Sequence, residues 1–380
     1  MAKIRVGLIG LSTNTQPMTA GTWGITAHLR PIQALADYEI VAVANSTVAS
    51  AKRSIEHHGL PAETKAYGSP DEIAADPDVD LVVVSVNVAK HFYLAKPALE
   101  KGKDIFVEWP LGASIAEAEE LTRLATANNV RTIVGLQARA DPAILKLKEV
   151  LASNKIGRIV SSVFTASTAT VPVDMWPHGA EYYLDFKSGG NEFTIFFGHL
   201  LDTFVHVLGD FSDVQGLLKS QYTTVPVIDP STGEVLDPAH AKSSPDHIFV
   251  QGILLNGAVS SLSLRKPKAA ADEVGFRWII TGTDGELVLT APERHWQFGL
   301  HGRSSDWSLR LKKGKETGFQ EIDLKDLDTS PASMVEQPGT NTARLYQSFA
   351  EGQGLEATFE SATKTHRLLE RIAKSAGWEL

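Results

Sequence analysis

The sequence predicts an α/β protein with an N-terminal Rossmann domain, built on a doubly wound parallel sheet, and a C-terminal α+β domain with a large open, mainly antiparallel sheet. Up to about residue 139, short β-branched runs alternate with helical segments at the spacing of βαβ units. Beyond about residue 160, alternating strand patterns dominate. A chain of 380 residues is also too long for one ordinary core. We therefore predict two domains, residues 1–137 and 138–380.

The N-terminal elements follow one another in regular order. Strands are expected at 3–10, 38–46, 80–87, 104–110 and 131–139, and helices at 27–37, 48–58, 91–102 and 114–129. The run at 80–87 is almost continuously apolar, as in a strand that is buried on both faces. Pro31 lies near the start of the first helix, where a missing N–H costs little. This order predicts a parallel sheet with right-handed crossovers.

The C-terminal elements follow a different pattern. Strands are expected at 161–168, 247–255, 258–265 and 277–290, and the Asp284-Gly285 pair inside the last run predicts a hairpin turn. Residues 223–245 are rich in Pro, Ser, Thr and Asp, so we predict a long surface loop there. Helices at 341–352 and 361–376 are expected to close the structure.

Composition excludes several classes of function. Hydrophobic residues make up 43% of the chain and charged residues 21%, which is typical of a soluble globular protein. A net charge of −9 without a Lys/Arg cluster argues against a nucleic-acid surface, and no apolar run could span a membrane. The lack of cysteine excludes disulfides and thiolate metal sites, and we expect no metal. The apolar N-terminus lacks a signal-peptide cleavage site, so we expect the cytoplasm, with the nucleus as the alternative.

The turn after the first strand is the first candidate binding site. In VGLIGLSTNT, Gly7 and Gly10 stand where glycine lets the backbone approach a pyrophosphate. Leu11 belongs to the same turn, and Ser12 and Thr13 would add hydroxyl contacts. Thr13 occupies the place of the third glycine of the usual fingerprint. A plain strand-to-helix turn is the alternative, but the βα units that follow favour a dinucleotide, NADP or NAD.

The end of the second strand bears on which dinucleotide is bound. An acidic residue there usually binds the ribose hydroxyls of NAD. This chain has Ser46 and Thr47 instead, with Lys52 and Arg53 shortly after them. Neutral polar groups with nearby cations would tolerate a 2′-phosphate, so the sequence favours NADP. The alternative is that the two cations only form a solvated helix face.

Further candidates follow the later strands. Val86 and Asn87 end the run at 80–87, and Asn87 would face the nicotinamide side of the groove. His91 opens the next helix, where a solvated histidine is the alternative. Glu108 and Trp109 end the run at 104–107, and the mouths of such strands carry the chemistry of many α/β enzymes. We count all five among the cofactor-binding candidates.

The motifs resemble those of the glucose–fructose oxidoreductase/inositol dehydrogenase (Gfo/Idh/MocA) family. The glycine turn, SVNVAKH, FVEWPL, LQARADPAILKLKEVLASNKIGRI and GGNEFTIFFGHLLDTFVHVLG occur in its order and spacing, from about residue 3 to about residue 285. The resemblance implies an NAD(P)-binding domain at 1–137. It also implies a domain at 138–380 whose open sheet forms a substrate wall and often an oligomer interface.

One branch of this family is similar in more detail. FVEW, LQ-R, FGH--D and PDHIFVQGILLNG resemble the branch of the yeast galactose-pathway transcriptional inhibitor, which includes fungal NAD(P)-binding oxidoreductase-like proteins. That inhibitor binds NAD(P) and acts by binding a transcriptional activator instead of turning over a sugar. Gln137 and Arg139, within LQ-R, complete the cofactor-binding candidates.

Two departures from the family pattern affect the expected chemistry. The family's Glu-Lys-Pro motif has a lysine that orients the substrate hydroxyl, and Trp109 stands in its place. Ile195 replaces an aspartate four residues before His199. The resemblance therefore implies His199 as the remaining polar catalytic group, and a helix residue hydrogen-bonded between the predicted domains is the alternative. The broad apolar face of Trp109 would favour a flat substrate, and Tyr182 is a rival proton donor.

The substrate candidates are Tyr183, Trp176 and His178. Tyr183 lies in GAEYYLDF and could also donate a proton, although core packing is the alternative for it and for its neighbour. Trp176 and His178 lie in DMWPHG, where a loop could cap a pocket or be simply solvated.

Two functions remain after this weighing. The first is an NAD(P)-dependent oxidoreductase acting on a small non-sugar, aromatic or unsaturated substrate without the family lysine. The second is a catalytically inactive dinucleotide-binding transcriptional regulator, whose partner would be a protein. Losing a general acid–base group costs about 10²–10⁴-fold in rate, which makes a sugar dehydrogenase the weaker expectation. We expect a homodimer or higher homo-oligomer, and neither nucleic acid nor membrane as a direct partner.

Overall fold

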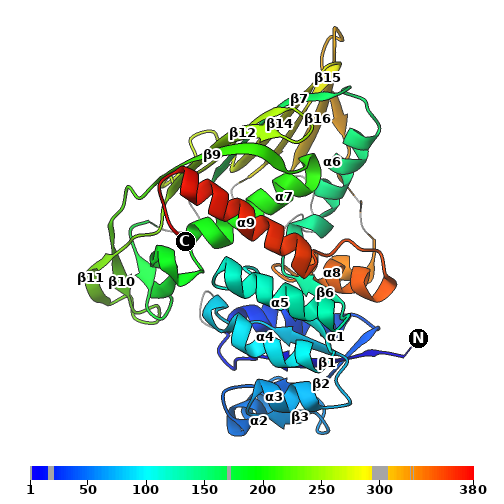
Figure 1. Cartoon of the computed structure of the whole chain (residues 1–380), viewed down its shortest axis with the longest axis vertical. Coiled ribbons are helices and arrows are strands. Elements are labelled where there is room, and N and C mark those ends of the chain that lie inside the picture. The colour runs from blue at the N-terminus through cyan, green and yellow to red at the C-terminus, as the bar shows by residue number, and fades with distance from the viewer. Residues whose placement is uncertain (1, 16–20, 169–172, 293–306, 326, 328) are drawn as a thin grey trace. The chain divides into compact units, whose positions relative to one another are not determined.

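The computed structural model describes residues 2–15, 21–168, 173–292, 307–325, 327 and 329–380. The chain forms two compact units, and Figure 1 labels many of their elements. The first comprises Met1–Ala140, Ser188–Gly190 and Ser330–Arg367, and the second comprises Asp141–Lys187, Asn191–Thr329 and Leu368–Leu380. Among the described residues, no helix is long and apolar enough to cross a membrane.

A six-stranded sheet forms the centre of the first unit, with the strand order β3-β2-β1-β4-β5-β6. In chain order, its strands are β1 Ile4–Ile9, β2 Tyr38–Ala44, β3 Lys65–Tyr67, β4 Leu81–Val84, β5 Asp104–Val107 and β6 Thr132–Val134. Every neighbouring pair is parallel. The order reverses between β1 and β4, which is the topological switch point of a Rossmann sheet. The predicted doubly wound parallel sheet is confirmed.

Helices cover the faces of this sheet. They are α1 Arg30–Ala34, α2 Val48–His57, α3 Pro70–Ala75, α4 His91–Glu100, α5 Ile115–Ala127 and α8 Thr340–Glu351. Helices α3, α4 and α5 pack side by side, whereas α1 packs against α8. The hydroxyls of Ser69 and Ser114 accept the backbone N–H groups of Glu72 and Glu117, which fixes where α3 and α5 begin. A π-helix at Gly24–Leu29 precedes α1.

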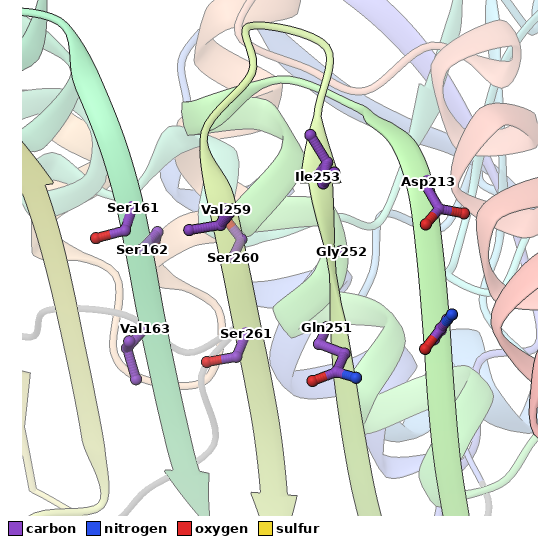
Figure 2. A pocket seen from close by; sticks show the side chains of 11 residues that line it. Ser161, Ser162, Val163, Asp213, Gln251, Gly252, Ile253, Val259, Ser260 and Ser261 are labelled. Atoms are coloured by element: carbon purple, nitrogen blue, oxygen red, sulfur yellow. The ribbon is translucent and has the colours of Figure 1, made fainter.

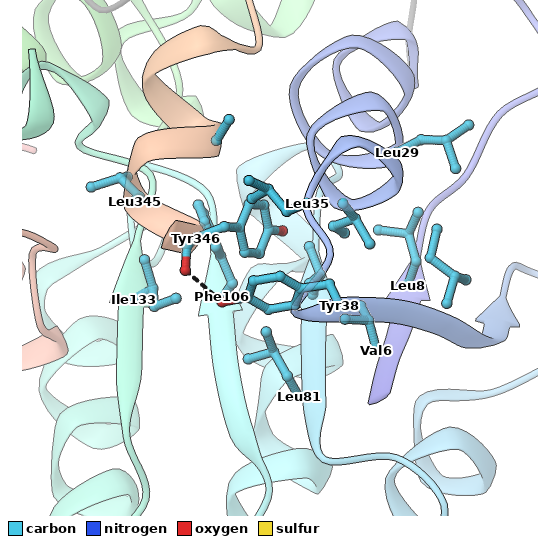
Figure 3. Close-up of a cluster of buried hydrophobic side chains, with 14 of the residues drawn as sticks. Val6, Leu8, Leu29, Leu35, Tyr38, Leu81, Phe106, Ile133, Leu345 and Tyr346 are labelled. Carbon is cyan, nitrogen blue, oxygen red and sulfur yellow. Dashed lines mark hydrogen bonds between the residues drawn. The ribbon is translucent and has the colours of Figure 1, made fainter. Parts of the chain in front are cut away.

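The core of the first unit joins strands from the N-terminal part of the chain to a helix from its C-terminal part. Val6, Leu81 and Phe106 are fully buried on the sheet, and Tyr346 of α8 packs with them (Figure 3). The Tyr38 hydroxyl donates to the Tyr346 carbonyl at 2.6 Å, so the contact is directional as well as apolar.

The compact units differ from the predicted ranges, 1–137 and 138–380, mainly at the C-terminal segment. Residues 330–367 belong to the first unit, because the apolar face of α8 completes its core. The buried residues on that face are Ala343, Leu345, Tyr346 and Phe349. The sequence predicts the helix, but helical periodicity cannot say which sheet the helix covers.

The second unit is built on an eight-stranded sheet with the order β17-β16-β15-β14-β7-β13-β12-β9. In chain order, these strands are β7 Ile159–Ser167, β9 Phe211–Lys219, β12 His247–Leu254, β13 Val259–Arg265, β14 Phe276–Gly282, β15 Gly285–Ala291, β16 Ser308–Lys313 and β17 Gln320–Ile322. Among these strands, one neighbouring pair, β13 with β7, is parallel and the others are antiparallel. The mainly antiparallel sheet and the hairpin at Asp284-Gly285 are confirmed.

The prediction of a long loop at 223–245 is wrong. Strands β10 Thr224–Ile228 and β11 Val235–Ala241 form a small sheet there with β8 Trp176–Pro177. Val225 and Val227 point to the same face of β10 and pack against Trp176 and Leu184. This tertiary packing stabilises strands in a segment whose composition favours a loop. The unit also contains α6 Pro142–Ala152, a π-helix at Glu192–Phe197 and α7 Gly198–Leu208, while α9 Phe359–Ser375 continues into it.

One face of the large sheet is open. Ser161, Val163 and Ser261 stand on β7 and β13 beside Gln251 and Ile253 of β12 (Figure 2), around a shallow depression of about 400 Å³. Strand alternation exposes apolar side chains on these strands and on β9, including Val163, Leu217, Phe249, Ile253 and Val259. The expected homo-oligomer stays a prediction.

Candidate nucleotide-binding site

A cavity of about 830 Å³ lies at the carboxyl ends of β1, β2 and β4 in the first unit. It therefore occupies the switch point, where Rossmann sheets bind their ligands. Its lining is mostly backbone, small and neutral polar groups, with Arg53 and Lys90 as cations. The predicted cofactor residues that line it are Gly10, Leu11, Ser12, Thr13, Ser46, Arg53, Val86 and Asn87.

The turn after β1 forms one wall of this cavity and requires glycine at residue 10. Gly10 has φ of +95°, and a Cβ there would lie 2.5 Å from Val86 Cγ1 and 2.8 Å from the Ser85 carbonyl oxygen. The Leu11 carbonyl accepts hydrogen bonds from Asn45 Nδ2 at 2.9 Å and from the Ser54 hydroxyl at 2.7 Å. The turn is thus fixed before any ligand arrives.

Gly7 and Thr47 are among the predicted cofactor residues that lie outside the cavity lining. Gly7 is inside β1, where a Cβ would lie 2.8 Å from Ile73 Cδ1, so its role is close packing of α3 on the sheet. Thr47 is the N-cap of α2 and forms a capping box with Ser50. Both residues shape the site without lining it.

The polar end of the cavity lies beside α2. Ser46 and Arg53 line it together with Ser50 and Ser69, which sequence reasoning missed. Lys52, the other cation considered beside Arg53, is exposed and does not line the cavity. Of the two cations that follow the second strand, Arg53 therefore lines the cavity and Lys52 lies outside it.

The turn after β4 closes the opposite wall. Asn87 lines the cavity, and its Oδ1 also accepts the Ala89 N–H at 3.0 Å, capping a short helix. His91 is 1% exposed, so the alternative of a solvated histidine is wrong. Its Nδ1 and Nε2 lie 2.8 Å and 3.0 Å from the carbonyl oxygens of Pro110 and Val86. Burial lowers the pKa of His91, and the imidazole ties the β4 and β5 turns together.

Glu108, at the end of β5, lies in a buried hydrogen-bonded chain instead of the cavity lining. Gln137 Nε2 donates to both of its oxygens, at 3.2 and 3.1 Å. His28 Nε2 lies 2.9 Å from Glu108 Oε1, and His28 Nδ1 lies 2.8 Å from the Tyr346 hydroxyl. Burial raises the pKa of Tyr346 well above its usual value. Sequence reasoning found the predicted pair Glu108 and Gln137 but missed His28 and Tyr346, which carry no local motif.

Trp109 and Arg139 are also buried in the first unit. Trp109 is 5% exposed, and its ring centroid lies 4.7 Å from that of His366. Arg139 Nη1 lies 3.3 Å from the Ser361 hydroxyl. Neither residue lines the cavity. Instead, both contact the first part of α9, which belongs to the same unit.

The predicted catalytic and substrate residues of the second unit lie in different surroundings. His199 is buried in the first turn of α7, and Trp176 stacks on Tyr183 with ring centroids 5.0 Å apart. Tyr182 is 39% exposed, while His178 Nδ1 pairs with Glu181 at 2.7 Å. The structure thus brings Trp176 and Tyr183 together.

Tyr183 also contacts two residues that sequence reasoning missed. Its hydroxyl donates to Glu192 at 2.9 Å, and Lys266 lies 2.8 Å from the same carboxylate. The only sequence signal for them is position, because Glu192 opens the apolar run before His199 and Lys266 follows a strand.

Comparisons with known proteins agree with the fold and with the cavity. A model of an oxidoreductase family with an NAD-binding Rossmann fold matches residues 4–136, and a model of the Gal80p C-terminal domain matches residues 142–291. Dehydrogenase aclE of Aspergillus oryzae is 31% identical over 376 residues, covering 98% of this chain and 96% of that protein. The galactose/lactose metabolism regulatory protein GAL80 of Kluyveromyces lactis is 32% identical over 297 residues, covering 75% of this chain and 63% of the regulator.

Solved structures extend the similarity to the whole chain. The transcriptional regulator Gal80p of Kluyveromyces lactis has a TM-score of 0.81 at 27% identity, covering 99% of this chain and 93% of that one. A levoglucosan dehydrogenase in complex with NADH and levoglucosan has a TM-score of 0.74 at 20% identity, covering 99% and 97%, and this likeness is one of fold alone. On these matches, the chain belongs to the Gfo/Idh/MocA oxidoreductase family with an NAD-binding Rossmann fold, whose members similar to it include both a dehydrogenase and Gal80 regulators.

Proposed function

We propose that this protein is an NADP-dependent oxidoreductase that transfers a hydride between the nicotinamide and a small non-sugar substrate with an aromatic or unsaturated group. The observation that carries this proposal is the cavity at the switch point of the first unit. Its size and its backbone-rich wall suit an extended dinucleotide.

The residues of the cavity fit such a cofactor. At Gly10 a backbone without a Cβ passes against Val86, leaving room for a pyrophosphate near Leu11 and Ser12. Ser46 and Arg53 would hold the adenosine ribose and its 2′-phosphate, because a guanidinium binds phosphate oxygens in a fixed geometry. Asn87 would contact the nicotinamide half of the cofactor. When bound, the cofactor supplies or takes up the hydride.

The non-sugar substrate is argued from the position that holds a lysine in the family motif. Trp109 occupies it and is packed on His366, so this position offers no cation to a substrate hydroxyl. An enone, an imine or another non-sugar acceptor needs less proton-transfer machinery than an alcohol. The similarity to the dehydrogenase over nearly the whole of both chains supports an enzyme.

The test is a fluorescence titration with NADPH and NADH. Arg53→Ala should raise the Kd for NADPH about tenfold, as expected for one lost charge-assisted contact, and leave that for NADH unchanged. Lys52→Ala is the matched control, because it removes a neighbouring cation outside the cavity, and it should change neither value. Equal wild-type affinities for the two cofactors would contradict NADP preference, and no binding at millimolar concentrations would exclude the cofactor site.

A dinucleotide-binding transcriptional regulator is the second candidate. It is favoured by the Gal80p C-terminal domain match over residues 142–291 and by the likeness to Gal80p over the whole chain. A regulator of this kind would bind NADPH without oxidising it in the presence of any carbonyl compound. Turnover of NADPH with a carbonyl substrate therefore separates the two functions.

A further inference from the structure

Three side chains of the first unit hold the backbone of the turn after β1. Asn45 Nδ2 and the Ser54 hydroxyl donate to the Leu11 carbonyl, at 2.9 and 2.7 Å. His58, the residue that ends α2, has its Nε2 2.7 Å from the Ser12 carbonyl oxygen. A carbonyl oxygen only accepts, so Nε2 carries the proton and donates the hydrogen bond. Two consecutive carbonyl groups of the turn are therefore fixed.

The fixed carbonyls determine where the next N–H groups point. In a planar trans peptide the C=O and the N–H point in opposite directions. The N–H groups of Ser12 and Thr13 therefore point away from the side chains that bind the carbonyls of Leu11 and Ser12. Both residues line the cavity, and within the described part of the chain neither N–H group has a hydrogen-bond partner. Successive free N–H groups in a turn are a usual binding site for an anion.

The wall next to this turn also presents an unused polar group. Ser85 is 3% exposed and lines the cavity, and its carbonyl oxygen would lie 2.8 Å from a Cβ at Gly10. Among the residues that the structure describes, the Ser85 hydroxyl has no hydrogen-bond partner. A buried hydroxyl without a partner is costly, so this part of the cavity suits a polar ligand.

Stability alone explains the contact of His58 with the turn poorly. Ser12 is half-buried and Thr13 is exposed, so water could replace the imidazole as the donor to the Ser12 carbonyl. The contribution of His58 to the free energy of unfolding is therefore small. Its effect on the direction of the Thr13 N–H is direct, because the two groups belong to one rigid peptide unit.

We propose that His58 is a positioning residue of the cofactor site, which aims the Thr13 N–H at the pyrophosphate by holding the Ser12 carbonyl. Asn45 and Ser54 aim the Ser12 N–H in the same way, through the Leu11 carbonyl. The proposal rests on the proposed function and names the residues that prepare its phosphate site. His58 gives the clearest test, because it lies outside the cavity lining, whereas Asn45 and Ser54 line the cavity themselves.

The test measures the Kd for NADPH and for NADH by fluorescence titration. His58→Ala and His58→Phe remove the donor, and each should raise both values about threefold to tenfold, the usual effect of one hydrogen bond. Both dinucleotides are weakened because both carry the pyrophosphate. His58→Gln keeps a donor and should restore most of the affinity. His57→Ala is the matched control, because His57 is the exposed neighbour of His58 and the hydrogen bond to Ser12 remains in that variant.

Two further measurements separate a positioning role from a structural one. The thermal midpoint of each His58 variant should stay near that of the wild type. The Kd for adenosine 2′-monophosphate, measured by calorimetry, should be the same in the wild type and in His58→Ala, because this nucleotide has no pyrophosphate.

The outcomes distinguish this inference from the proposed function. If the wild type binds neither NADPH nor NADH at millimolar concentrations, the proposed function fails and the inference falls with it. If the wild type binds a dinucleotide and both His58→Ala and His58→Phe keep its Kd within twofold, the inference is overturned while the proposed function stands. Equal weakening of NADPH and adenosine 2′-monophosphate in His58→Ala, or an equal loss of affinity in His57→Ala, overturns it as well.

Discussion

Gly10 is the residue on which the shape of the cavity depends most directly. Its φ of +95° and the closeness of Val86 and Ser85 leave no room for a Cβ. Gly10→Ala should therefore displace the turn and weaken NADPH binding at least tenfold, roughly 1.4 kcal/mol or more. Gly59→Ala is the control, because Gly59 also has positive φ, +60°, but a Cβ there meets nothing within 4 Å.

Both glycine variants carry the cost of a left-handed backbone, about 1–2 kcal/mol in stability, but only one lies in the cavity wall. Fluorescence titration and thermal unfolding measure the two effects separately. Equal NADPH affinities in the two variants would mean that the turn does not form the pyrophosphate wall.

Residue types at strand ends were predictable from the sequence, whereas their partners were not. Gly10, Ser12 and Asn87 follow strands that the apolar runs mark, and parallel strands bring such ends to one edge of a sheet. His28 and Tyr346 lie 318 residues apart in the chain and meet only through packing. No local spacing could reveal that contact, or the one between Glu192 and Lys266.

At the scale of elements, α9 contributes a testable contact to the first unit through His366. This histidine packs on Trp109, and burial, followed by the nearby His91, lowers the pKa of His366 from 6.5 to about 3. The folded protein therefore holds the imidazole neutral, while the unfolded chain takes up a proton below pH 6.5. The contribution of His366 to the free energy of unfolding is fully present above that pH. It falls by about 1.4 kcal/mol per pH unit as the pH drops toward 3.

His366→Leu should remove this acid sensitivity. Urea unfolding gives the free energy of unfolding at pH 7 and at pH 5. Between these two pH values the wild type should lose about 2 kcal/mol more of it than the variant does. His57→Leu, at an exposed position of α2, should keep the wild-type dependence. An identical loss in the wild type and in His366→Leu would show that His366 is not held neutral by its surroundings.

The regular elements were predictable and the irregular ones were not. Period-2 and period-3.6 patterns predict β1, β2, β4, β5, β6 and α8, because burial on a sheet or helix face leaves a periodic trace. The three-residue strand β3 was missed. Strands β10 and β11 lie in a segment with the composition of a loop, and they exist because Val225 and Val227 pack on Trp176 and Leu184. The π-helices also gave no signal, since their apolar residues fit an α-helical pattern equally well.

At the scale of the whole molecule, the candidate cavity and the buried ion pair belong to different units. The first holds the cavity assigned to the cofactor, and the second holds Tyr183 with its buried ion pair. The division of the chain into a nucleotide-binding part and a following sheet domain was predictable from the order of the motifs. The return of residues 330–367 to the first unit was not, because only the packing of α8 determines it.

The central claim is hydride transfer, and a label tests it most directly. The protein would be incubated with NADPH deuterated at the transferable position of the nicotinamide ring and with para-nitrobenzaldehyde or acetophenone, and the products analysed by mass spectrometry. The account predicts an alcohol product one mass unit heavier, with the deuterium on the former carbonyl carbon. NADPH binding without deuterium in any product would contradict the claim and favour the regulator.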